Sequence, residues 1–190
     1  MKSNAYGGIM DVPNGARNVT GLNRAYQTWK DMLKRCYSEN AQKKNPTYIG
    51  CSVCDEWKYY SNFKEFYNAN YVEGFQLDKD ILIEGNKVYS PDTCVFVPSR
   101  INSLLNSRKS ARGKYPIGVD LRNDTGKFRA SCMVDGKQKC IGVFETIDEA
   151  FTAYVEAKKC EVARVVEDAL ANGEITRVIA NALLSKRIKS

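Results

Sequence analysis

Residues 118–159, GVDLRNDTGKFRASCMVDGKQKCIGVFETIDEAFTAYVEAKK, carry the clearest structural pattern in the chain. Apolar and polar residues alternate over 118–122, 127–134 and 137–144, which is the period of β-strands that bury one face. The NDTG and DG sequences between these segments are typical of tight turns that join antiparallel strands. The pattern therefore predicts a three-stranded antiparallel sheet.

A helix is predicted directly after this sheet. Thr146 is followed three residues later by Glu149, which is the spacing of a capping box at a helix N-terminus. The helical pattern continues to Gly173, and a shorter helical segment follows it. A further helical pattern of apolar residues covers 22–37 near the N-terminus. Separate runs of strands and helices predict the α+β class, with this N-terminal helical part as a lead-in.

The composition is that of a folded protein with one or two small domains. The chain has 190 residues, 43% of them hydrophobic and 27% charged, and it contains no run of about 18 apolar residues. The N-terminus lacks the continuous apolar segment of a secretion signal. The seven cysteines have scattered positions, which fits free thiols better than a disulfide framework. We therefore expect a cytoplasmic protein without a membrane segment.

Histidine is absent from the chain. This excludes reactions that need an imidazole as general base or as zinc ligand, and with them the Ser-His-Asp and Cys-His nucleophile systems. Any base would have to be tyrosine, lysine, a carboxylate or a metal-bound hydroxide.

Positive charge is concentrated in one part of the chain. Lys and Arg number 29 against 22 Asp and Glu, a net charge of +7, and residues 99–140 hold ten basic and three acidic residues. A basic block inside a folded chain indicates a polyanionic partner, and double-stranded DNA is the first candidate. An RNA partner is supported only by this same basic block. The basic residues are Arg100, Arg108, Lys109, Arg112, Lys114, Arg122, Lys127, Arg129, Lys137 and Lys139.

A second patterned unit precedes most of this block. Residues 75–82 alternate as a strand, 94–97 form a second extended run, and Pro98 is predicted to open a helix. If the first segment is a strand, Asp78 and Asp80 lie on one of its faces, because strand side chains alternate. Two carboxylates that face an asparagine of the following helix form an all-oxygen site suited to Mg²⁺.

Residues 77–105, LDKDILIEGNKVYSPDTCVFVPSRINSLL, resemble the ββα-metal finger of HNH endonucleases from phages and mobile elements. They are most similar to the His-less, PacI-like type. The resemblance implies that Asp78 and Asn102 hold Mg²⁺ or Mn²⁺, with Asp80 as a further candidate ligand. It also implies that Tyr89 replaces the histidine base and that Lys79 supports the phosphate. The matching positions are Leu77, Asp78, Lys79, Tyr89, Ser90, Pro91 and Asn102.

Residues 115–159 are similar to the apetala-two/ethylene-response-factor (AP2/ERF) domain. The agreement lies in GV-x-x-R at 118–122, F-x-A at 128–130, IG-x-F at 141–144 and E-A-x-x-A-Y at 149–154. That domain packs three strands on one helix and lays its sheet in the DNA major groove. The similarity therefore implies a C-terminal domain that binds DNA through its sheet.

Strand alternation also predicts where the basic side chains of this domain lie. Lys127 and Arg129 share one strand face, and Lys137 and Lys139 share a face of the next strand. Acidic residues are scarce on these strands, so a DNA-binding sheet surface is favoured over an ordinary solvated face.

Together the two resemblances predict two modules. Residues 1–108 would hold the helical lead-in and the nuclease finger, and residues 113–190 the DNA-binding domain, with a basic linker between them. The predicted function is a Mg²⁺-dependent DNA endonuclease of the homing type, which nicks one strand or cuts both as a homodimer. The alternative is a non-catalytic DNA-binding regulator, or an anti-defence protein, built on an inactive finger.

Two further patterns each have two interpretations. Cys51 and Cys54 form a C-x₂-C pair that could bind zinc with Cys36 and Cys94, but one such pair without histidine favours small buried thiols over a structural zinc site. The aromatic residues between 57 and 67 could stack on bases, but their helical spacing favours a place in the core.

Overall fold

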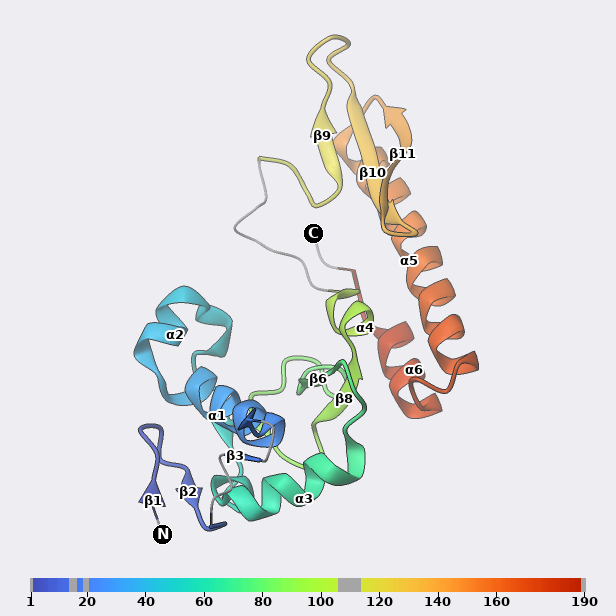
Figure 1. The fold of residues 1–190 in the computed structure, drawn as a ribbon. Coiled ribbons are helices and arrows are strands. Elements are labelled where there is room, and N and C mark those ends of the chain that lie inside the picture. Colours follow the sequence, from blue (N-terminus) through green and yellow to red (C-terminus); the bar gives the residue numbers. More distant parts are fainter. Residues whose placement is uncertain (1, 14–16, 19–20, 106–113, 189–190) are drawn as a thin grey trace. The chain divides into compact units, whose positions relative to one another are not determined.

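The computed structural model describes residues 2–13, 17–18, 21–105 and 114–188, and the chain divides into two compact units, Met1–Ser99 and Arg100–Ser190 (Figure 1). Each unit has a hydrophobic core of its own. The module boundary that the sequence predicts, at 109–112, lies outside the described residues. No helix in the described part of the chain is both long and apolar enough to cross a membrane.

The first unit is built around two helices whose apolar faces pack together. In the longer one, Trp29, Met32 and Leu33 follow one another at helical spacing and are fully buried. The indole of Trp29 donates a hydrogen bond to the carbonyl of Trp57 at 2.7 Å. The elements are β1 (Lys2–Ser3), β2 (Ile9–Met10), β3 (Arg17–Asn18), β4 (Gly21–Leu22), α1 (Arg24–Tyr37), α2 (Glu39–Lys44), η1 (Pro46–Tyr48), β5 (Ser52–Val53), η2 (Glu56–Lys58), α3 (Tyr60–Asn70), β6 (Phe75–Asp78), β7 (Val88–Tyr89) and β8 (Val95–Pro98).

The aromatic residues at helical spacing between 57 and 67 belong to the core of this unit, whereas Tyr59 is exposed. Trp57, Tyr60 and Phe63 are fully buried, and the rings of Trp57 and Phe63 meet edge to face with centroids 5.2 Å apart. The interpretation of these residues as core is therefore confirmed, and they offer no exposed ladder for bases.

The strand predicted over 75–82 is shorter in the structure. β6 ends at Asp78, whose carboxylate Oδ1 accepts the backbone N–H groups of Asp80 at 2.7 Å and Ile81 at 2.8 Å. These two bonds close a turn, which ends the strand. Asp80 therefore lies beyond the strand, and the argument that alternation places it on one face with Asp78 is wrong.

β6 pairs with β8, so two antiparallel strands lead directly into a helix. In this register Leu77 lies opposite Phe96 and Asp78 opposite Val95. Pro98 is the last residue of β8 rather than the first of the helix. The helix α4 spans Ser99–Ser103. β7 pairs instead with β5, in parallel.

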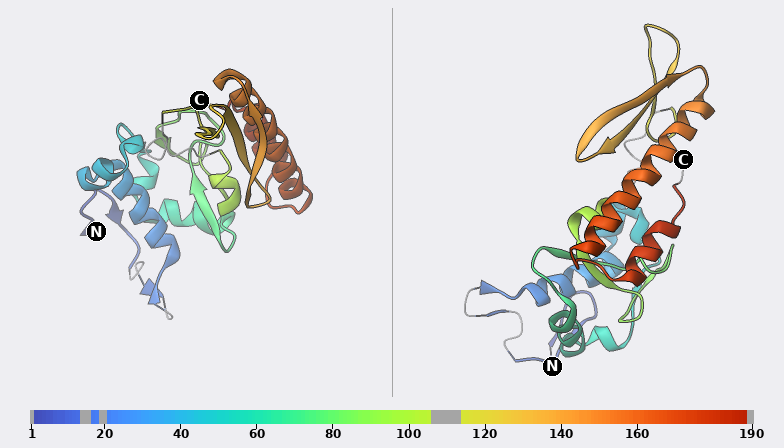
Figure 2. Two further views of the ribbon diagram at one scale, coloured as in Figure 1. Left: turned by 90° about the horizontal axis from the view of Figure 1, so that it is seen from above. Right: turned by 90° about the vertical axis from the view of Figure 1, so that its right-hand side faces the viewer.

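The second unit contains the predicted three-stranded antiparallel sheet, with strand order β11-β10-β9. α5 lies along one face of this sheet (Figure 2), where Ala130 and Cys132 pack with Ala150 and Tyr154. The capping box of Thr146 and Glu149 is present, as predicted. The α+β class is therefore confirmed. The elements are β9 (Val119–Leu121), β10 (Phe128–Val134), β11 (Lys137–Phe144), α5 (Ile147–Ala171) and α6 (Arg177–Ser185).

A β-bulge changes which side chains share a face of the sheet. Ala130 pairs with Gly142 but the next residue of β10, Ser131, pairs with Cys140, so Ile141 is an extra residue in β11. Between the turn and the bulge, Lys139 lies opposite Cys132, a residue of the core beneath the sheet. Arg129, by contrast, lies opposite Val143 and faces away from α5.

Candidate functional site

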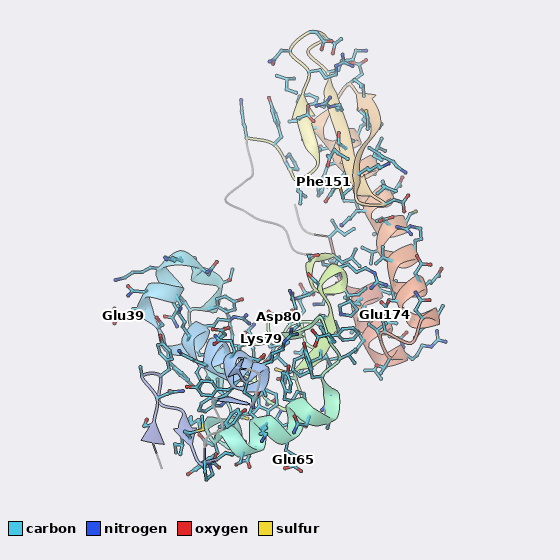
Figure 3. The ribbon with its side chains drawn as sticks, in the orientation of Figure 1. Glu39, Glu65, Lys79, Asp80, Phe151 and Glu174 are labelled. Carbon is cyan, nitrogen blue, oxygen red and sulfur yellow. The ribbon has the colours of Figure 1, made fainter. Side chains whose placement is uncertain are left out.

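The loop between β6 and β7 is organised around a buried lysine. Lys79 is 4% exposed, and its Nζ donates to both carboxylate oxygens of Asp80 at 2.7 Å and to the carbonyl of Asn86 at 2.7 Å. Figure 3 shows Lys79 and Asp80 side by side. All three ammonium protons thus have acceptors within the protein. In this conformation Lys79 stabilises the loop rather than presenting its charge to a phosphate.

Asn86 closes the same loop from its other end. Its side-chain amide donates to the carbonyls of Lys79 at 2.8 Å and Val88 at 2.7 Å, and its side-chain oxygen accepts the N–H of Val88 at 3.0 Å. Sequence reasoning did not identify Asn86 as important. The Gly85-Asn86 pair indicates only a turn, and the interactions of the asparagine follow from how the loop folds.

Asp78 stands at the entrance to this loop, at the end of β6, and is half-buried. Carboxylate oxygens are ligands that Mg²⁺ prefers. Asp80 is a weaker candidate for that role, because Lys79 bonds both of its oxygens. Asn102, the amide ligand that the resemblance implies, lies on α4, which belongs to the second unit.

Asp78 is the carboxylate of this loop that a metal ion could use, since Lys79 binds both oxygens of Asp80. Within the described ranges, no group of three or more His, Cys, Asp or Glu side chains could hold a metal ion. Mg²⁺ usually keeps several waters and uses one or two carboxylates together with substrate phosphates. Asp78 fits such a site as the single carboxylate.

Tyr89, the residue proposed to replace the histidine base, is 2% exposed. Burial raises the pKa of its phenol well above the usual value, although the nearby guanidinium of Arg35, a hydrogen-bond partner of the hydroxyl, acts in the opposite direction. The ammonium of Lys79 lies 5.8 Å from the centroid of the ring. A general base would need a lowered pKa, so in this conformation Tyr89 is a neutral, buried hydroxyl at physiological pH.

Three of the four cysteines considered as zinc ligands are buried in the core of the first unit. These are Cys36, Cys51 and Cys94, while Cys54 is half-buried. Burial raises the pKa of Cys36 and of Cys94 to about 12. Since the thiolate is the form that binds metals, these two residues are protonated core thiols at physiological pH.

Most of the described basic residues of the predicted DNA-binding block have an acidic neighbour. The guanidinium of Arg129 donates to both oxygens of Asp120, from Nε at 3.2 Å and from Nη2 at 2.9 Å. Exposed ion pairs of this kind contribute little free energy, so these cations can exchange a carboxylate for a phosphate. The other pairs are Arg100–Glu174, Arg122–Asp124, Lys127–Glu145 and Lys139–Asp135.

The remaining basic residues of the block divide into two groups. Lys114 and Lys137 are described and exposed. Arg108, Lys109 and Arg112 lie outside the described residues.

Within the described part of the second unit, α5 covers one face of the sheet and leaves the other face open. Pairing across the strands places Asp120, Arg129, Met133 and Val143 on this open face. Arg122 and Lys127 extend it, since the N–H of Arg122 donates to the carbonyl of Lys127 at 2.8 Å directly beyond the paired residues. These six residues form the open face referred to below.

Comparison with protein-family models, with curated proteins and with solved structures found no match to this chain. Two regions are therefore candidates on the strength of their own residues. They are the Asp78 loop of the first unit and the open face of the second.

Proposed function

We propose that this chain is a Mg²⁺-dependent DNA endonuclease whose second unit binds double-stranded DNA through the open face. The endonuclease part of this proposal rests on one observation. Asp78 ends the first strand of an antiparallel pair, β6 and β8, that leads directly into a helix, which is the element order of a ββα finger. We place the activity in the cytoplasm, as a monomer that nicks one strand or a homodimer that cuts both.

In this proposal the residues of the first unit have distinct tasks. Asp78 supplies the carboxylate for the metal. Lys79 and Asn86 hold the loop after Asp78 closed, through the bonds to Asp80 and to the loop backbone. A bound Mg²⁺ would stabilise the charge that develops on the phosphate.

A second candidate function is favoured by a different observation. Lys79 and Tyr89 are both buried, so neither reaches a substrate in the described conformation. This is the arrangement expected of a protein that binds DNA without cleaving it. The non-catalytic regulator therefore remains the alternative.

Cleavage of supercoiled plasmid in Mg²⁺ separates the two candidates. Asp78→Asn keeps an oxygen that can accept the N–H groups of Asp80 and Ile81 but removes the charge that a metal needs. We expect this variant to lose cleavage by about 10²-fold or more and to keep its affinity for DNA. Asp92→Asn, which changes an exposed acid of the same unit, is the matched control.

Each outcome of this assay decides between the functions. Cleavage that stops in EDTA and in Asp78→Asn supports the endonuclease. Full activity in Asp78→Asn would contradict the assigned metal ligand. A wild-type protein that binds DNA but does not cut it, in Mg²⁺ or Mn²⁺, would instead favour the regulator.

A further inference from the structure

The open face of the second unit carries two exposed apolar side chains, one of which lies directly opposite its arginine. Met133 is 49% exposed and Val143 40% exposed, and both point away from the core that the sheet forms with α5. Val143 lies directly opposite Arg129 in the strand pairing. Asp120 accepts hydrogen bonds from Nε and Nη2 of Arg129, and the two residues share this face with Val143.

The distribution of charge in the second unit indicates which class of ligand binds the open face. Of the six residues that form the open face, Arg122, Lys127 and Arg129 are basic and Asp120 is acidic, whereas α5 holds six acidic and three basic residues. A polyanion is therefore attracted to the sheet side of the unit and repelled from the helix side. The acidic residues of α5 are Asp148, Glu149, Glu156, Glu161, Glu167 and Asp168.

The side chains of the open face indicate which group of the DNA they contact. The major groove of DNA admits a β-ribbon, and the C5 methyl of thymine is the apolar group that base pairs present there. Opposite residues of paired strands lie about 5 Å apart, which is between one and two base-pair steps. An apolar side chain and an arginine at this spacing can contact neighbouring base pairs.

We propose that the open face recognises thymine, with Val143 and Met133 in contact with the C5 methyl groups. This inference rests on the proposed binding of DNA by the second unit and names the feature of the duplex that it reads. Arg129 provides the polar contact next to the methyl groups. Uracil lacks the methyl, so the face distinguishes duplexes that contain thymine from otherwise identical ones that contain uracil.

A duplex of alternating dA and dT, compared with one of alternating dA and dU, tests this directly. The two differ only in the C5 methyl groups, and the comparison leaves the protein unchanged. We expect the full-length protein, in EDTA to prevent cleavage, to bind the thymine duplex about fourfold more tightly for each methyl contact, as measured by fluorescence anisotropy. With both side chains engaged, the preference should be about tenfold or more.

Substitutions in the protein assign the preference to the two side chains. Val143→Ala and Met133→Ala should each reduce the preference for thymine about fourfold, and both positions are exposed, so the fold is retained. Val178→Ala is the matched control, since Val178 is 67% exposed but lies on α6. It should leave the preference unchanged.

Three results would overturn the inference, and they differ in what they say about DNA binding. Equal affinity of the wild-type protein for the two duplexes would refute thymine recognition and leave DNA binding in place. Binding to neither duplex would refute the proposed DNA-binding function and, with it, this inference. A preference that survives in the Val143→Ala, Met133→Ala double variant would place the recognition elsewhere and also overturn it.

Discussion

Tyr89 is the residue whose sequence-based role and structural environment differ most. Its hydroxyl has Arg35 as hydrogen-bond partner, and burial keeps the phenol protonated across the physiological range. Tyr89→Phe keeps the ring but leaves a half-buried guanidinium without this acceptor, so we expect the free energy of unfolding to fall by about 1–3 kcal/mol. Urea denaturation followed by tryptophan fluorescence reports the first unit alone, because both tryptophans, Trp29 and Trp57, lie in it.

The same variant tests whether Tyr89 is a base. A catalytic base would instead show a single-turnover cleavage rate about 10²-fold or more below wild type, with unchanged stability. Tyr59→Phe, at an exposed tyrosine, is the control for loss of a phenol hydroxyl. Loss of stability with an unchanged rate would leave Tyr89 a structural residue.

Individual residues are predictable from sequence where a local rule determines them. The capping box of Thr146 and Glu149 depends only on a spacing of three residues, and the structure has both of its hydrogen bonds. The burial of Lys79 depends on Asp80 and on the carbonyl of Asn86, which meet only when the loop closes. Gly118 lies between these two cases. It belongs to the GV-x-x-R pattern of residues 118–122, but only the structure shows that a Cβ there would lie 2.1 Å from the ring of Tyr154.

Secondary-structure elements are predictable where alternation and turn sequences agree. The three strands and the long helix of the second unit follow from those signals and match the structure closely. β6 is shorter than its pattern because Asp78 caps the turn that ends it. The bulge at Ile141 leaves no mark in the alternation, yet it determines that Val143, rather than Gly142, lies opposite Arg129.

The turn between β10 and β11 is tied to α5 by a buried carboxylate. Glu161 accepts the N–H of Asp135 at 3.2 Å and pairs with Arg164 at 2.8 Å. Glu161→Ala removes both interactions, so we expect the hairpin to lose about 1–3 kcal/mol of stability. Faster amide hydrogen exchange in residues 133–138 of this variant would show the loss of hairpin stability. Glu167→Ala, at an exposed position of the same helix, should leave this exchange unchanged.

The stabilisation of the hairpin by Glu161 should also depend on pH. The hydrogen bond from Arg164 holds the pKa of Glu161 below its ordinary value of 4.5. A lowered folded-state pKa means that the stabilisation is fully present above the unfolded pKa and is lost as the pH falls through the folded value. Protection of the hairpin in the wild type should therefore decrease below pH 4.5, and Glu161→Gln should abolish this part of the pH dependence. An identical pH profile in the two proteins would contradict the role given to the carboxylate.

Across the whole molecule, positive charge is divided unequally between the two units. Residues 100–190 hold 17 basic and 11 acidic residues, while residues 1–99 hold 12 and 11. The sequence reveals this imbalance without a structure. It does not reveal that the acidic residues of the second unit gather on α5 while the sheet carries a basic excess, because that separation depends on which elements the chain brings to each side.

This separation predicts which cations give DNA binding its dependence on salt. Arg122 and Lys127 lie opposite one another on the open face, so we expect each to neutralise a phosphate and to release counterions. Replacing both with Gln should make the slope of log K against log salt less steep by about 2, since each contact contributes about 0.9. Lys158 and Lys159, an adjacent pair on α5, provide the control, and their replacement with Gln should leave the slope unchanged. A larger change from the helix pair than from the sheet pair would mean that DNA approaches the second unit from the side of α5.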